Sequence, residues 1–138
     1  MAPVALDADV LIAFLDPGDA QHERAIGELR PRLAAAEQLI VGASVYAEVM
    51  VRPLQQGTDA KVDEFLDATG TRVLGVDRPL ARRAAQLRAR HPSLRLGDAL
   101  SLATAAGNDA QLITLDQRLQ RVAARERASQ QDGPENRP

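Results

Sequence analysis

The chain has 138 residues and a formal net charge of −2, values that fit one globular domain with a core of its own. It contains no cysteine, so disulfide bonds and thiolate metal sites are both excluded. Its apolar runs are too short for a membrane span, and its first residues lack the basic flank of a signal peptide. We therefore expect a soluble, cytoplasmic protein.

The first predicted elements are a strand and two helices. Residues 3–6 (PVAL) predict a strand, and a short helix follows Asp9 until the turn residues of 16–19 (DPGD) end it. Apolar side chains at helical spacing predict the next helix: Ile26, Leu29 and Leu33. Pro31 falls inside this stripe, so we expect it to break or kink the helix.

The middle of the chain alternates in the same way. Residues 38–42 (QLIVG) and 71–76 (TRVLGV) predict the second and third strands. A helix starts near Ser44, and a further helix carries an apolar stripe formed by Val62, Phe65 and Leu66. After the third strand, Asp77 is the expected N-cap of a helix whose apolar stripe is Leu80, Ala84 and Leu87.

The last predicted elements are a helix that opens at Asp98 (DALSLATAAG) and a fourth strand over residues 110–114 (AQLIT). Strands that alternate with helices indicate an α/β domain around a parallel sheet. The final ten residues, 129–138, contain no apolar side chain that could join a core. We therefore expect one domain over residues 1–128 and a disordered tail over residues 129–138.

Charge is unevenly distributed along the chain. Residues 1–77 contain 13 acidic and 6 basic side chains, a net of −7, whereas residues 78–138 contain 6 acidic and 11 basic ones, a net of +5. A basic side of the surface would attract a polyanion, but ordinary solvated helix faces give the same pattern.

Acidic residues follow the predicted strands. Asp7 and Asp9 come after the first strand, Glu48 lies one turn into the helix after the second, Asp98 begins a helix, and Asp116 follows the fourth strand. In a parallel sheet the carboxyl ends of all strands share one edge, where a crevice forms if the strand order reverses. We therefore expect these acids to converge.

Each acid also has a plain structural interpretation. Asp9, Asp98 and Asp116 are plausible helix N-caps, and Glu48 could pair with the arginine four residues later, Arg52. Asp7 is the hardest to explain in this way. A carboxylate at the end of a strand covered on both faces is costly unless something compensates its charge.

Several carboxylates in one pocket require protons or a cation, because two of them about 4 Å apart repel by roughly 4 kcal/mol at an effective dielectric constant of 20. Oxygen ligands without cysteine favour Mg²⁺ or Mn²⁺ over zinc. The two histidines, His22 and His91, lie in polar contexts, where we expect structural or surface roles. Such an ion suits phosphoryl chemistry, since it binds phosphate and lowers the pKa of a bound water.

Four segments in this order and spacing, VALDADVLIAFLD, SVYAEV, LRLGDALSLATA and LITLD, resemble the PIN-domain ribonucleases, and specifically the VapC-type toxins of bacterial toxin–antitoxin pairs. The resemblance covers residues 3–127 and implies a three-layer α/β/α fold around a parallel sheet of four or five strands. It also implies a Mg²⁺- or Mn²⁺-dependent endoribonuclease site. The residues that match the family's four acids are Asp7, Glu48, Asp98 and Asp116.

Within that match, Asp7, Asp98 and Asp116 would be the metal ligands, and Thr114 matches a polar position that could order a carboxylate or a water. The chain departs from the family pattern at two places. Position 9 is more often Ser or Asn, so Asp9 is either an auxiliary ligand or a helix cap. The family usually ends in a fifth strand, for which the residues after Asp116 contain no convincing candidate.

The resemblance further implies a homodimer and a cognate VapB-type antitoxin, whose basic residue could compete with metal for the acids. Five arginines are candidates for binding RNA phosphates: Arg82, Arg83, Arg88, Arg90 and Arg95. Aromatic residues are few, so base stacking should contribute little to RNA recognition.

Two other functions remain open. A strand followed by D-x-D also opens the haloacid-dehalogenase-like phosphatases, but their mechanism needs a lysine near the site, and the sole lysine, Lys61, falls in a helix between the second and third strands. The other alternative is a catalytically idle PIN-like binding module. The presence of all four acids argues against it.

Overall fold

The computed structural model describes residues 2–131 and contains a four-stranded sheet. Its strands are β1 (Val4–Leu6), β2 (Leu39–Gly42), β3 (Arg72–Leu74) and β4 (Gln111–Ile113). They lie in the order β3-β2-β1-β4, and all neighbouring pairs are parallel. The predicted α/β class with a parallel sheet of four strands is confirmed, and no fifth strand occurs within the described residues.

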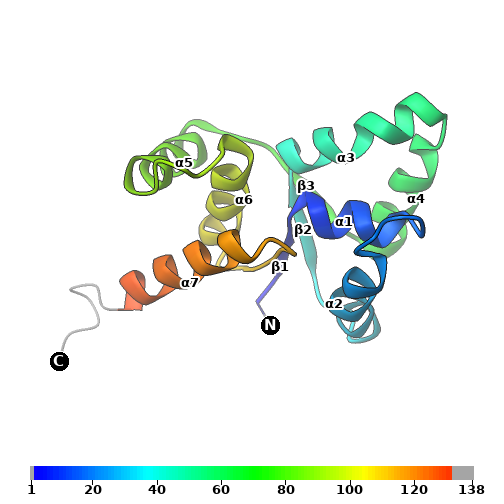
Figure 1. Ribbon diagram of the computed structural model, residues 1–138, viewed down its shortest axis with the longest axis horizontal. Helices are drawn as coiled ribbons and strands as arrows, with labels where there is room; N and C mark the ends of the chain where they lie inside the picture. The colour runs from blue at the N-terminus through cyan, green and yellow to red at the C-terminus, as the bar shows by residue number, and fades with distance from the viewer. Residues whose placement is uncertain (1, 132–138) are drawn as a thin grey trace.

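Seven helices within residues 2–131 cover this sheet on both faces, as Figure 1 shows. On one side lie α1 (Ala8–Leu15), α2 (His22–Ala34), α3 (Ala43–Gln56) and α4 (Asp59–Thr69). On the other side lie α5 (Arg78–Arg90), α6 (Leu96–Gly107) and α7 (Gln117–Gln131). This is the predicted three-layer α/β/α arrangement.

The strand β1 is covered on both faces because its side chains alternate between the two helical layers. Val4 and Leu6 pack into the core formed with α1 to α4, whereas Ala5 packs against Ala105 of α6. All three strand residues are at most 3% exposed. Asp7, the next residue, is therefore a carboxylic acid placed directly at the end of a fully apolar strand.

The turn predicted after α1 and the cap predicted for α5 are both confirmed. Asp16 accepts a hydrogen bond from the backbone N–H of Gly18 at 2.9 Å, which closes the turn. Asp77 accepts one from the N–H of Leu80 at 3.0 Å, which satisfies a free donor at the start of α5.

Of the two outcomes predicted for Pro31, a break or a kink of its helix, the break does not occur, because α2 continues to Ala34. A proline inside a helix removes one backbone hydrogen bond. The buried face of α2 compensates for this loss, since Ala25 and Leu29 are both 0% exposed against the core.

The helix α7 extends to Gln131 and so includes three residues of the segment for which a disordered tail is predicted. Leu119 and Val122 anchor this helix against α5 and α6, and extending an anchored helix costs little per residue. The rest of the predicted tail, residues 132–138, lies outside the described residues. No helix within residues 2–131 is long and apolar enough to cross a membrane.

Candidate active site

The sheet has one position where the order of strands reverses, between β1 and β4. From β1 the chain moves outward to β2 and β3 and then returns to place β4 on the other side of β1. Asp7 directly follows β1, Thr114 directly follows β4, and the Asp7 N–H donates to the Ile113 carbonyl at 3.0 Å. A crevice at the carboxyl ends of two such strands is where open α/β sheets bind ligands.

Asp7 is a buried carboxyl, with only 7% of the residue exposed. Its Oδ1 accepts a hydrogen bond from Ser101 Oγ at 2.9 Å, and its Oδ2 accepts one from Thr114 Oγ1 at 3.0 Å. Burial raises the pKa of Asp7, although these hydrogen bonds oppose the change, and the charge of Asp98 raises it further. No ion pair within residues 2–131 compensates the Asp7 charge.

Asp9 binds the loop after β4 and does not cap α1. It is the second residue of that helix, whose N-cap position is Asp7. Its carboxylate accepts a hydrogen bond from the Leu115 N–H at 3.1 Å and lies 3.1 and 3.3 Å from Thr114 Oγ1. Burial, followed by the charge of Asp7, raises the Asp9 pKa.

Thr114 connects three of the acids through one hydroxyl group. It has a single proton to donate, and both Asp7 and Asp9 lie within hydrogen-bond distance of it. Its oxygen also accepts a hydrogen bond from the Asp116 N–H at 3.2 Å. The side chain of Thr114 therefore orders two carboxylates and the backbone of a third acidic residue.

Asp98 is the third residue of α6, so the alternative interpretation of Asp98 as the N-cap of this helix is wrong. Burial is the main cause of its raised pKa; the charges of Asp116 and Asp9 also raise it, whereas Arg95 and Arg118 lower it. Ser101 follows Asp98 by one helical turn on the same face of α6 and reaches Asp7. The sequence interpretation missed Ser101, although a hydroxyl one turn after an acid in an otherwise apolar helix was the available signal.

Glu48 lies on α3 and forms no ion pair with Arg52 within the described residues, so the alternative interpretation of Glu48 as part of a surface ion pair is wrong. The residue as a whole is exposed, but its carboxyl is partly desolvated. This desolvation and then the charges of Asp7, Asp98 and Asp9 raise its pKa. Glu48 is therefore influenced electrostatically by the acids on the other elements.

Gly97 explains how Glu48 comes so near to α6. A Cβ atom added at Gly97 would lie 2.9 Å from Glu48 Oε1, closer than real Cβ atoms stand to other atoms. Glycine at this position therefore leaves space for the Glu48 carboxyl beside the first turn of α6. The sequence interpretation did not select Gly97.

Asp116 is exposed and caps α7, as one of its two interpretations predicted. Its Oδ1 accepts hydrogen bonds from the N–H groups of Arg118 at 2.8 Å and Leu119 at 3.3 Å. Both bonds use the same oxygen, so Oδ2 is available to another ligand. Asp116 and Asp98 line the same hollow, and the charge of Asp116 raises the pKa of Asp98.

The arrangement has the donor chemistry of a site for a hard divalent cation. Four carboxyls have raised pKa values: Asp7, Asp9, Glu48 and Asp98. Within residues 2–131, no three acidic or histidine side chains stand close enough together to surround one ion on their own. Mg²⁺ commonly binds through one or two carboxylates and keeps several waters, so these oxygen donors fit such an ion.

Both histidines have structural contacts between helices, as expected. His22 Nδ1 is hydrogen-bonded to the Ala13 carbonyl at 2.7 Å, which joins α2 to α1. His91 Nε2 lies 2.7 Å from Glu126 Oε1 and joins the end of α5 to α7.

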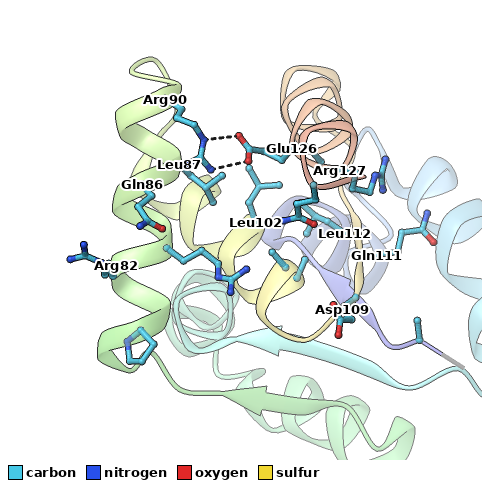
Figure 2. A pocket seen from close by; sticks show the side chains of 18 residues that line it. Arg82, Gln86, Leu87, Arg90, Leu102, Asp109, Gln111, Leu112, Glu126 and Arg127 are labelled. Carbon is cyan, nitrogen blue, oxygen red and sulfur yellow. Dashed lines mark hydrogen bonds and ion pairs between the residues drawn. The ribbon is translucent and has the colours of Figure 1, made fainter. Parts of the chain in front are cut away.

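The five arginines predicted to bind RNA do not all line one hollow. Arg82 and Arg83 line a groove of about 820 Å³ between α5 and α7, where Figure 2 labels Arg82, and the acids do not line this groove. Arg88 Nε donates to the Leu94 carbonyl at 3.1 Å and so supports the loop between α5 and α6. Arg95 lines a different hollow together with Asp98 and Asp116, whereas Arg90 lines both this hollow and the groove.

Comparison with known proteins identifies the family to which this fold corresponds. A family model described as the PIN domain matches residues 4–125. A toxin–antitoxin complex from Klebsiella pneumoniae is similar in structure, with a TM-score of 0.66, 25% sequence identity, and coverage of 83% of this chain and 88% of that chain. No curated protein sequence gave a match.

A second solved structure shares the fold. VapC20 of Mycobacterium tuberculosis, a toxin that cleaves the sarcin–ricin loop, has a TM-score of 0.68 and 21% identity, with coverage of 86% of this chain and 93% of that chain. The family model spans most of the sequence, and the strand order and helical layers described above agree with it. The chain therefore belongs to the PIN-domain family.

Proposed function

We propose that this chain is a Mg²⁺- or Mn²⁺-dependent endoribonuclease, the VapC-type toxin of a toxin–antitoxin pair. Membership of the PIN-domain family and the similarity to a toxin–antitoxin complex support this proposal. The observation that carries it is Asp7, a carboxyl that is 7% exposed, has only neutral hydrogen-bond partners and feels the charges of other acids. A cation at this crevice would remove the cost of that arrangement.

One or two of the carboxylates of Asp7, Asp98 and Asp116 would hold the ion together with water molecules, and the bound ion would polarise a phosphate oxygen and lower the pKa of a water. Ser101 and Thr114 fix the orientation of the Asp7 carboxyl through both of its oxygens. Glu48, with its raised pKa, is suited to accept a proton from the attacking water. Asp9 is an auxiliary acid that holds the loop after β4 in place.

The proposed partners are an RNA substrate, a VapB-type antitoxin and a second copy of the chain in a homodimer. A basic antitoxin side chain that entered the crevice would find carboxylates that form no ion pair within residues 2–131. It would therefore compete with the metal ion for the same oxygens, which gives a physical route to inhibition.

The test is cleavage of a mixed RNA substrate by purified protein with Mn²⁺ or Mg²⁺ and with EDTA. Wild type should produce discrete fragments only with metal, and Asp98→Asn, which should keep the fold, should produce none. Absence of cleavage together with absence of a metal-dependent thermal shift would leave only a binding module.

Hydrolysis of a small phosphomonoester in the same assay would instead favour the phosphatase alternative. The structure gives that alternative little support. Lys61 is exposed on α4, and none of the charges that shift the pKa values of the acids comes from it.

A further inference from the structure

One face of α7 carries a row of arginines beside the acids. Arg118, Arg121 and Arg125 are three and four residues apart, a spacing that places them on the same side of a helix. Together with Arg90 and Arg95 they line a cleft of about 440 Å³ that also contains Asp98 and Asp116. We call this hollow the arginine cleft.

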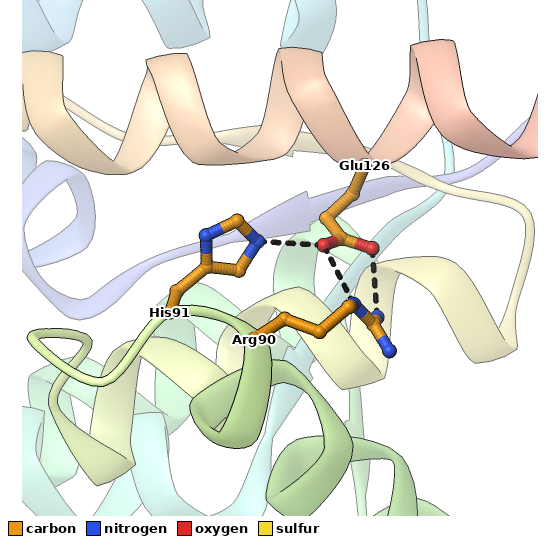
Figure 3. A network of polar contacts seen from close by, with 3 residues as sticks. All are labelled: Arg90, His91 and Glu126. Carbon is orange, nitrogen blue, oxygen red and sulfur yellow. Dashed lines mark hydrogen bonds and ion pairs between the residues drawn. The ribbon is translucent and has the colours of Figure 1, made fainter.

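The two walls of the arginine cleft are held together at both ends. Near the acids, Arg118 Nη2 on α7 donates to the Ser93 carbonyl in the loop between α5 and α6, at 3.3 Å. At the far end, Figure 3 shows Glu126 of α7 accepting two hydrogen bonds from Arg90, at 2.8 and 3.2 Å, and lying 2.7 Å from His91. The cleft is thus a feature of the packed fold.

The chemistry of the lining fits a polyanion. Five arginines and two aspartates line the cleft, so its charges sum to +3, and Arg90 is the one arginine of the five that is paired with a glutamate within the described residues. No phenylalanine, tyrosine or tryptophan is among the lining residues. Binding here would therefore use the phosphate backbone of a nucleic acid and not base stacking.

The size of the cleft favours one strand over a duplex. A volume of about 440 Å³ is that of a small-molecule pocket. From Arg118 to Arg125 the helix rises by about 10 Å, at about 1.5 Å per residue. At about 3.4 Å per nucleotide, this length corresponds to about three nucleotides of a stacked strand.

We infer that the arginine cleft binds the phosphates of about three nucleotides of single-stranded RNA on one side of the scissile bond, guiding the strand to Asp98 and Asp116. This inference rests on the proposed function. It assigns to Arg118, Arg121 and Arg125 the role that the sequence gave to Arg82 and Arg83. The latter two line the groove between α5 and α7, which shares Arg90 with the cleft, but they do not line the cleft itself and so provide a matched control.

The test measures binding of a fluorescently labelled single-stranded RNA of twelve nucleotides in EDTA, where cleavage is absent, between 50 and 200 mM KCl. The cleft variant is Arg121→Gln with Arg125→Gln, and the control is Arg82→Gln with Arg83→Gln. Both remove two exposed arginines and change the net charge equally. Equal Tm values for the three proteins establish that the folds are intact.

The cleft variant should weaken RNA binding at least fivefold at 100 mM KCl. Its slope of log K against log salt concentration should be shallower by about 1.4, because each single-strand phosphate contact contributes about 0.7. The control should keep the wild-type affinity and slope. An unchanged slope in the cleft variant, or an equal loss in the control, would overturn the inference.

This binding assay separates the inference from the proposed function. If wild type binds RNA through Arg121 and Arg125 and yet cleaves none with Mn²⁺, the cleft stands and the nuclease proposal fails. If wild type cleaves RNA and the cleft variant does so with unchanged KM, the nuclease proposal stands and the cleft assignment is wrong.

Discussion

Replacing Asp7 with asparagine should remove cleavage and stabilise the metal-free protein. Asparagine keeps the shape of the side chain, can still bond to the hydroxyls of Ser101 and Thr114, and leaves the Thr114 proton available to Asp9. It removes a carboxyl whose pKa is raised by burial and by the charge of Asp98. A tenfold difference in proton affinity between folded and unfolded chains is worth about 1.4 kcal/mol.

The sign of the pH dependence follows from the raised pKa. The folded wild type retains the Asp7 proton at pH values where the unfolded chain has released it, so stability falls as pH rises from about 4 through the raised folded pKa. Above that pKa the full penalty is present. In EDTA at pH 8, Asp7→Asn should therefore gain about 1 to 2 kcal/mol, a rise in Tm of about 3 to 8 °C.

The assay is thermal unfolding of wild type and Asp7→Asn at pH 4 and pH 8, in EDTA and in excess Mn²⁺. The Tm advantage of the variant should be small at pH 4 and larger at pH 8. Mn²⁺ should raise the Tm of wild type more than that of the variant, because the ion binds only to the folded protein. A variant that melts well below wild type in EDTA at pH 8 would refute the reasoning.

Three further substitutions test the contacts around the acids. Gly97→Ala should lower the cleavage rate about tenfold without lowering Tm, because the new Cβ displaces the Glu48 carboxyl while alanine favours the helix. Thr114→Val should cost about 1 to 3 kcal/mol in chemical unfolding, because it leaves buried carboxyls without their shared donor. Glu126→Gln should lower stability by less than about 1 kcal/mol at pH 7, since the Arg90 side chain of the pair is 54% exposed.

Each of these has its own control. Cleavage by Gly97→Ser should fall like that of Gly97→Ala, and full activity in both would show that Glu48 is not needed near α6. Thr114→Ser should retain the stability that Thr114→Val loses. For Glu126, hydrogen bonding to Arg90 lowers the carboxyl pKa, so its contribution is present above the unfolded pKa and is lost as pH falls through the folded one. A loss in Glu126→Gln that is larger at pH 3 than at pH 7 would contradict this assignment.

Local sequence patterns predicted the four strands and several helices, because an apolar run or an apolar helix face is formed by residues that are close in the sequence. The apolar run at residues 3–6 became a buried central strand, and Asp77 became a cap, since both depend on a few adjacent residues. Pro31 does not end its helix, because α2 is stabilised by core contacts with residues that are distant in the sequence. The helix α7 occupies the segment after Asp116, where the family usually has a strand.

The acids of the site were found from their positions after strands, but their partners were not. Ser101 and Thr114 reach Asp7 across 94 and 107 residues of sequence, and such contacts appear only when the fold is known. Gly97 was missed for the same reason, because its role is to leave space for a side chain on another helix. The arginines on α7 were missed because helical spacing alone does not show which face meets the acids.

The measurement that tests the central claim most directly is RNA cleavage by wild type and Asp98→Asn with Mn²⁺, compared with the same reactions in EDTA. We predict fragments from wild type with Mn²⁺ alone, and none from Asp98→Asn at an equal or higher Tm. Cleavage by Asp98→Asn at the wild-type rate, or cleavage by wild type in EDTA, would contradict a metal-dependent site built from these carboxylates.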